Sequence, residues 1–336
     1  MERYFLGNNT AYGFFGNYDE ELRNKNKVVL LKGGPGTGKS SILKKVAAEA
    51  KSRGLDYELW YCSGDPASLD GVYVKQLDTA IVDATAPHAS GADLPKIKDF
   101  LYDLASSLSH AKLKEHKEVI EKLTKDKKWY FMRAYQHLKS ALCHFNNQIQ
   151  LEMQGLKVEN VRAYAAVLAS DLRAKCKDVL ARRKVFTHAI CPKGENVYYD
   201  HLRGKTIFKV DGSAAAKKIF FDELAGHTEG GTVILNPLDP NVIDGLVHGS
   251  VAIVADAGHL KNEVSENVNL RVYEGALPNA AIEEEKNGVI TQIAFCEEQL
   301  ENARERHLGM EKYFISAMDF DNNDRIYGEI RQIIFG

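Results

Sequence analysis

The stretch that decides the fold is Lys32-Gly33-Gly34-Pro35-Gly36-Thr37-Gly38-Lys39-Ser40, which follows the apolar run Val28–Leu31. Its spacing, G-x-x-x-x-G-K-S, predicts a strand, a glycine-rich loop and a helix, which is the arrangement of a P-loop. Glycines let backbone N–H groups approach phosphate oxygens, and the N-terminus of the following helix also favours anions. The sequence therefore predicts a nucleoside triphosphate site in this loop.

Each position of the loop has an expected role. Lys39 is expected to neutralise the β- and γ-phosphates and to act in catalysis, while the Ser40 hydroxyl ligates Mg²⁺. No [NT]KxD motif for guanine follows at a suitable place, so the predicted ligand is ATP with Mg²⁺. The residues predicted to bind it are Gly33, Gly34, Pro35, Gly36, Thr37, Gly38, Lys39, Ser40 and Ser41.

Composition limits the class of protein. The chain has 336 residues, 44% hydrophobic and 27% charged, which is typical of a globular protein with room for two domains. The net charge of −2 argues against nucleic acid as a partner. Five cysteines, odd in number and without a CxxC pair, predict reduced thiols rather than disulfides or a zinc site. No signal peptide or apolar run of 18 residues is found, so we expect a cytoplasmic protein without a membrane partner.

The chain contains an internal repeat. Lys27–Gly34 aligns without gaps with Lys205–Gly212, and Ala80-Ile81-Val82 matches Ala252-Ile253-Val254. Between these segments, Asp65-Pro66 and Asp70-Gly71 match Asp239-Pro240 and Asp244-Gly245. Four matches in the same order predict a duplication with its boundary near residue 184.

The second copy of the loop has lost its phosphate chemistry. Gly36 and Gly38 are replaced by Ala214 and Ala216, and Lys218 stands in place of Ser40. An alanine forced into the left-handed conformation costs about 1–2 kcal/mol, and its methyl group obstructs the phosphate. We therefore expect one competent site for each chain, in the N-terminal repeat.

Alternating strands and helices predict two tandem α/β domains of the P-loop NTPase type, each with a parallel sheet and a helical extension. An apolar seam with heptad spacing from Phe131 to Ile149, and a second seam from Val161 to Val179, predict an antiparallel helical hairpin. The predicted units are residues 1–94 (intact P-loop), 95–184 (helical hairpin), 185–275 (degenerate P-loop) and 276–336 (C-terminal helices).

Three aspartates are candidates for the chemistry. Asp83 ends an apolar strand and is expected to join Ser40 in holding Mg²⁺, although it could also cap the strand. Many P-loop motors place a glutamate next, but here the residue is Ala84, so a general base must come from elsewhere. Asp65 and Asp70 are the catalytic candidates because they follow the second strand, where ligands collect, and His88 is a further candidate for the base. The alternatives are a turn for Asp65, a helix N-cap for Asp70 and a solvated loop side chain for His88.

These motifs resemble a family of uncharacterised bacterial tandem P-loop ATPases. The resemblance spans the whole chain and rests on Lys32–Ser40, on Cys62–Gly71 and on Ala80–His88. It implies two P-loop domains and nucleotide binding, but no physiological substrate. Both halves can carry an intact loop in that family, and this chain departs from the pattern at Ala214, Ala216 and Lys218.

Three functions stay open at this point. The first is slow ATP hydrolysis coupled to movement of the helical extensions. The second is a kinase that transfers the γ-phosphoryl group to a small molecule or nucleotide, and the third is a module in which ATP acts only as a switch. The sequence identifies no protein or small-molecule partner other than ATP.

Overall fold

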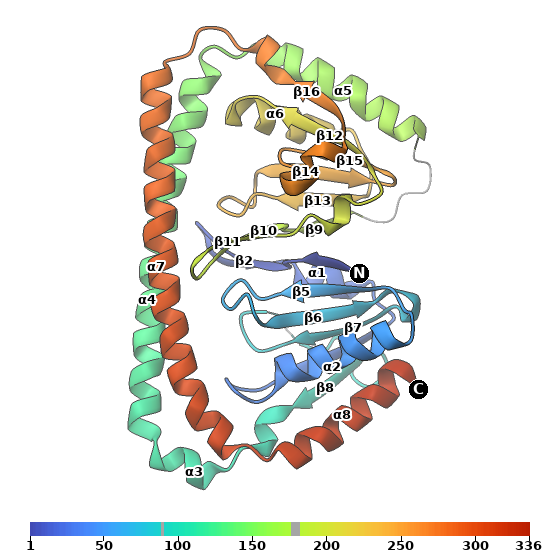
Figure 1. Ribbon diagram of the computed structural model, residues 1–336, viewed down its shortest axis with the longest axis vertical. Helices are drawn as coiled ribbons and strands as arrows, with labels where there is room; N and C mark the ends of the chain where they lie inside the picture. The colour runs from blue at the N-terminus through green and yellow to red at the C-terminus, as the bar shows by residue number, and fades with distance from the viewer. Residues whose placement is uncertain (89–90, 176–181) are drawn as a thin grey trace.

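The computed structural model describes residues 1–88, 91–175 and 182–336, and Figure 1 shows the arrangement of its elements. The first sheet has six strands in the order β1-β5-β6-β7-β4-β8. Their bounds are β1 (Glu2–Tyr4), β5 (Tyr57–Tyr61), β6 (Leu69–Val74), β7 (Thr79–Asp83), β4 (Lys27–Lys32) and β8 (Asp99–Asp103). The second sheet repeats this order as β9-β13-β14-β15-β12-β16. Its bounds are β9 (Arg183–Val185), β13 (Thr232–Leu235), β14 (Ile243–His248), β15 (Val251–Val254), β12 (Thr206–Asp211) and β16 (Val264–Asn269).

The matching strand orders confirm two similar α/β domains, but the prediction of parallel sheets is wrong. β6 pairs antiparallel with both β5 and β7, and β14 pairs antiparallel with both β13 and β15. The sequence gives no signal for β6, because Leu69–Val74 follows directly on a polar loop and no helix lies between β5 and β6. Each sheet is therefore mixed. An antiparallel meander lies beside the parallel strand that leads into the glycine-rich loop, β4, or into its counterpart, β12.

Each domain also has a short hairpin, β2 (Gly7–Thr10) with β3 (Gly13–Gly16) and β10 (His188–Cys191) with β11 (Gly194–Val197). The α-helices are α1 (Tyr18–Arg23), α2 (Lys39–Ser52), α3 (His110–Glu115), α4 (Lys117–Met153), α5 (Val158–Lys175), α6 (Ala214–Gly226), α7 (Asn279–Ala317) and α8 (Phe320–Phe335). Short 3₁₀ turns are η1 (Lys75–Leu77), η2 (Leu104–Ser107), η3 (Asp200–Leu202), η4 (Gly258–Glu263) and η5 (Leu270–Tyr273).

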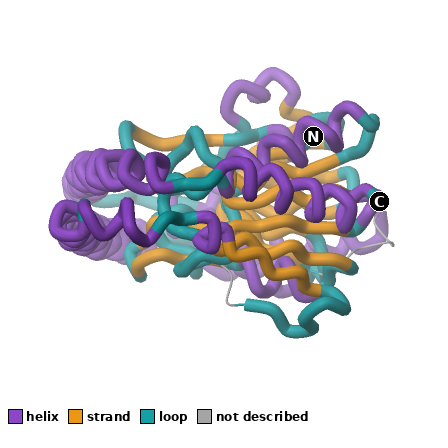
Figure 2. Tube along the Cα trace, turned by 90° about the horizontal axis from the view of Figure 1, so that it is seen from below, coloured by secondary structure: helices purple, strands orange, loops and turns teal. Residues whose placement is uncertain are grey.

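The two long helices, α4 and α7, pack antiparallel along one edge of the molecule, as Figures 1 and 2 both show. We call them the arms. His137 contacts Gln292 at 2.8 Å, and nearer the first domain Lys127 lies 3.5 Å from His307. The predicted hairpin between residues 131–149 and 161–179 is therefore wrong, because α4 pairs with a helix of the other repeat. Two residues of the second seam, Cys176 and Val179, lie outside the described residues. The predicted helical unit 95–184 also begins with a strand, β8, rather than a helix.

The helices that follow the arms are exchanged between the domains. α5 belongs to the first repeat by sequence, yet its seam residues Val161, Ala165 and Leu172 are buried with Phe220 of α6 in the second domain. Conversely, Ile326, Ile330 and Ile334 of α8 are buried with α2 and β4 in the first domain. In Figure 1, α5 accordingly lies over the second sheet and α8 over the first. Each domain completes its core with a helix from the other repeat.

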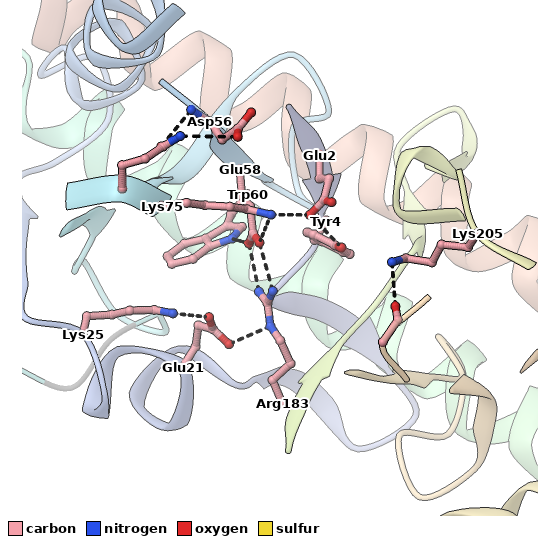
Figure 3. A network of polar contacts seen from close by, with 12 residues as sticks. Glu2, Tyr4, Glu21, Lys25, Asp56, Glu58, Trp60, Lys75, Arg183 and Lys205 are labelled. Carbon is pink, nitrogen blue, oxygen red and sulfur yellow. Dashed lines mark hydrogen bonds and ion pairs between the residues drawn. The ribbon is translucent and has the colours of Figure 1, made fainter. Parts of the chain in front are cut away.

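The edge strands β1 and β9 meet between the domains. Just beyond them, Phe5 and Phe186 exchange two backbone hydrogen bonds of 2.9 Å. Arg183 donates to both oxygens of Glu58 at 3.0 and 2.9 Å and to Glu21 at 3.1 Å, and Figure 3 shows it pointing between these carboxylates. Burial favours a higher pKa for Glu58, but the charge and hydrogen bonds of Arg183 outweigh it and lower the pKa to about 2. A buried ion network therefore joins the two repeats.

Candidate functional site

The glycine-rich loop lies where the sequence predicts it, between β4 and α2. Gly36 and Gly38 have φ angles of 67° and 87°, in the left-handed region that glycine occupies without strain. Gly38 caps the N-terminus of α2, whose first amides have no partners within the helix. The backbone therefore has the curvature of a loop that can turn N–H groups toward an anion.

Lys39 and Asp83 come together at the end of the sheet. β4 and β7 are neighbouring parallel strands in which Leu31 and Asp83 are register partners. The Lys39 amine donates to the carbonyls of Gly33 and Gly34 at 2.8 and 2.9 Å, and lies 3.6 Å from the Asp83 carboxylate. The lysine of the loop and the last residue of the neighbouring strand therefore form an ion pair at this edge of the sheet.

The other predicted site residues have separate surroundings. The Ser40 hydroxyl accepts from the Leu69 N–H at 3.2 Å, and the neighbouring Ser41 is exposed. Asp65 accepts from Ser68 at 2.7 Å and from Arg304 of α7 at 3.1 Å. Burial opposes ionisation of Asp65, yet these two bonds lower its pKa below the usual value.

Residues of the second repeat cover the loop. The Glu311 carboxylate, on α7, accepts from the Gly36 N–H at 3.1 Å. Asn323, on α8, donates to the Thr37 carbonyl at 2.8 Å. A methyl group at Gly34 would meet the Phe314 ring at 3.2 Å. An anionic side chain from the far repeat therefore occupies an amide that a phosphate oxygen would use.

Positive charge gathers beside Lys39. Burial and the charges of Lys127 and Lys39 lower the pKa of His307 to about 4. Burial, Lys128 and Lys39 also lower the pKa of Lys127. The lysines come from α2 and α4, so two elements place positive charge here, while His307 of α7 stays neutral beside them. This positive charge favours an anionic ligand.

The equivalent loop of the second domain has a different shape. Only Gly212 and Ser213 separate β12 from α6, whereas Gly33–Gly38 separate β4 from α2. The helix begins earlier because Ala214 and Ala216, unlike the glycines they replace, favour helical angles. The loop nest itself is therefore absent from the described second domain.

In the second loop, carboxylates accept hydrogen bonds from the backbone N–H groups at the start of α6. Glu274 accepts from the Ser213 N–H at 2.6 Å, and Glu152, at the end of α4, accepts from the Ala215 N–H at 2.9 Å. Beside them lies a cavity of about 440 Å³ whose lining includes Lys217 and Asp244. Burial raises the pKa of Asp244 to about 6.

Asp70 does not face solvent at the loop. It is 4% exposed, and its carboxylate accepts from the Tyr18 hydroxyl at 2.9 Å and lies 3.3 Å from Nε2 of His88. Cys62 completes this group, and burial together with the Asp70 charge raises the pKa of its thiol to about 11. Burial alone would lower the pKa of His88, but Asp70 raises it well above its usual value.

Several residues of this site escape sequence analysis. Glu311 and Asn323 reach the loop from α7 and α8, and no local motif marks them. The same holds for Lys127 and His307, which the arms bring near Lys39. Tyr18, whose hydroxyl donates to Asp70, belongs to no motif found in the sequence.

Comparisons of the chain with protein-family models, with curated proteins and with solved structures found no match. Among the helices of the described residues, none combines the length and apolar character needed to cross a lipid bilayer.

Proposed function

We propose that the first domain binds ATP with Mg²⁺ in the loop Gly33–Ser40 and that binding is coupled to the arms. Lys39 neutralises the β- and γ-phosphates, and Ser40 and Asp83 hold the metal. The proximity of Lys39 to Asp83 supports this assignment, as does the positive charge that Lys39 and Lys127 place beside the loop.

The observation that carries the coupling is the hydrogen bond from the Gly36 N–H to Glu311. A bound phosphate and this carboxylate compete for the same amide, and their like charges repel. ATP therefore displaces Glu311, which lies six residues before the end of α7, and loosens the contact between this arm and the first domain. Asn323 and Phe314 move with it because they belong to the same C-terminal segment.

The proposed turnover is slow hydrolysis. Ala84 follows Asp83, so the position that carries a general base in many P-loop motors has none. Asp65 is the better placed of the two catalytic candidates, since Asp70 is buried against Tyr18 and His88. Arg304, held by Asp65, is suited to stabilise charge on a transferring phosphoryl group.

Calorimetry with ATP and Mg²⁺ tests the proposal. We expect one ATP for each chain, loss of binding in Lys39→Ala, and nearly unchanged binding in the matched control Lys217→Ala. ADP release without an acceptor would distinguish hydrolysis from phosphoryl transfer and from a switch without turnover. Equal losses in the two lysine variants, or absence of ATP binding by the native chain, would refute the proposal.

A further inference from the structure

Three side chains with metal-binding atoms converge at the loop edge of the first sheet. Cys62 directly follows β5, Asp70 lies near the start of β6, and His88 lies in the segment after β7. Because β6 runs antiparallel to both neighbours, the end of β5, the start of β6 and the end of β7 share one edge. The ligand atoms of the three residues all lie within 4.8 Å of one another.

The orientation of the His88 ring is set by its other nitrogen. Nδ1 lies 2.8 Å from the Thr85 carbonyl oxygen, which can only accept a hydrogen bond. Nδ1 therefore carries a proton, and in the neutral ring the lone pair is on Nε2, which faces Asp70. A histidine that binds a metal usually donates its second N–H to a carbonyl or carboxylate in this way.

Neighbouring aromatic residues hold the other parts of the cluster. The Tyr18 hydroxyl donates to Asp70 at 2.9 Å, which orients the carboxylate. The rings of Tyr18 and Phe14 pack edge-on against the His88 ring, with centroids 5.3 and 5.5 Å away. The imidazole and the carboxylate thus both have the supporting contacts found around metal ligands.

We propose that Cys62 Sγ, an Asp70 carboxylate oxygen and His88 Nε2 bind a divalent transition metal of the zinc class. Sulfur, nitrogen and oxygen donors together suit Zn²⁺, whereas Mg²⁺ and Ca²⁺ take oxygen ligands. Three protein ligands leave the fourth tetrahedral position for water or another ligand. The site uses different residues from the Mg²⁺ position proposed at Ser40 and Asp83.

The second repeat serves as an internal comparison. Asp244 aligns with Asp70, and the same alignment places Asn236 at the position of Cys62. The Asn236 amide donates to the Asp244 carboxylate at 3.0 Å. An N–H donor therefore satisfies the carboxylate where the first repeat has a thiol, so we assign the metal to the first repeat alone.

The competing explanation is a buried Asp70–His88 ion pair with Cys62 merely beside it. Titration of the full-length, reduced and metal-stripped chain with Co²⁺, in the absence of nucleotide, separates the two. We expect one Co²⁺ for each chain with a thiolate-to-cobalt charge-transfer absorption, and displacement of the cobalt by Zn²⁺. Cys62→Ser and His88→Gln should lose this absorption, and Tyr18→Phe should weaken binding roughly 10- to 100-fold.

Two controls keep the result specific. Cys143→Ser removes an exposed thiol outside the cluster and should retain the absorption. Lys39→Ala should retain it as well, so failure of ATP binding and failure of metal binding are distinguishable. A native chain without a sulfur-to-cobalt absorption at equimolar Co²⁺, or a Cys62→Ser chain that keeps it, would overturn the metal site.

Discussion

The hydrogen bond between Gly36 and Glu311 makes the proposed coupling measurable in one substitution. Glu311→Gln preserves the size of the side chain and an oxygen that can accept from the Gly36 N–H, but removes the negative charge. If ATP must displace this carboxylate from its 3.1 Å contact, the neutral variant should bind ATP more tightly than the native chain.

The size of the effect follows from the kind of bond that is lost. A hydrogen bond to a charged group contributes about 1.5–3 kcal/mol, and a neutral one about 1 kcal/mol. The difference is on the order of 0.5–2 kcal/mol, and since 1.4 kcal/mol is a factor of ten, we expect roughly 2- to 30-fold tighter ATP binding. Relief of the repulsion between Glu311 and the phosphates acts in the same direction.

Calorimetric titration with ATP and Mg²⁺ measures this change directly. Glu305→Gln is the matched control, because it removes an exposed carboxylate from the same helix without touching the loop. An unchanged or weakened affinity in Glu311→Gln, relative to that control, would show that Glu311 does not compete with phosphate and would refute the coupling.

Three further outcomes concern stability. Because the pKa of Glu58 is lowered, its ion pair with Arg183 stabilises the fold fully above the unfolded pKa of about 4.3, and this stabilisation of about 3 kcal/mol is lost as the pH falls toward 2. Denaturation of Glu58→Gln should therefore show less loss of stability between pH 5 and 3 than denaturation of the native chain. Ile330 of α8 is fully buried, so Ile330→Ala should lower the free energy of unfolding by about 2–5 kcal/mol. Ile290 is 66% exposed, so Ile290→Ala should change it by less than about 0.5 kcal/mol, and equal effects of the two substitutions in urea denaturation would contradict the exchanged core. Residues 1–184 expressed alone lack α8 and should not form a stable ATP-binding monomer, so a fragment that sediments as a monomer and binds ATP like the full chain would refute the mutual dependence of the repeats.

The features of this fold that can be predicted from the sequence are those set by residues close together in the chain. The loop from Gly33 to Ser40 needs particular backbone angles within a few residues, so its glycines mark it, and Asp83 is marked by the apolar strand that it ends. The contact of Glu311 with Gly36 cannot be predicted in this way, because 275 positions of sequence separate the two residues. A heptad seam such as Phe131–Ile149 shows that α4 packs against another helix but not which helix it is. The cluster of Cys62, Asp70 and His88 cannot be found in the sequence for a related reason. The strand β6, which the sequence does not reveal, returns the chain so that the ends of β5 and β7 lie at one edge of the sheet.

The exchange of α5 and α8 gives a physical reason for keeping a second repeat whose loop lacks the glycines of the first. The first domain closes its core with Ile326, Ile330 and Ile334, which the second repeat supplies. The residue that competes for the loop amide, Glu311, also comes from the second repeat. A substitution in the second loop leaves both contributions intact, whereas loss of the repeat would expose the first core and release the loop from its carboxylate. The helices of the second repeat therefore support the first domain independently of what the second loop binds.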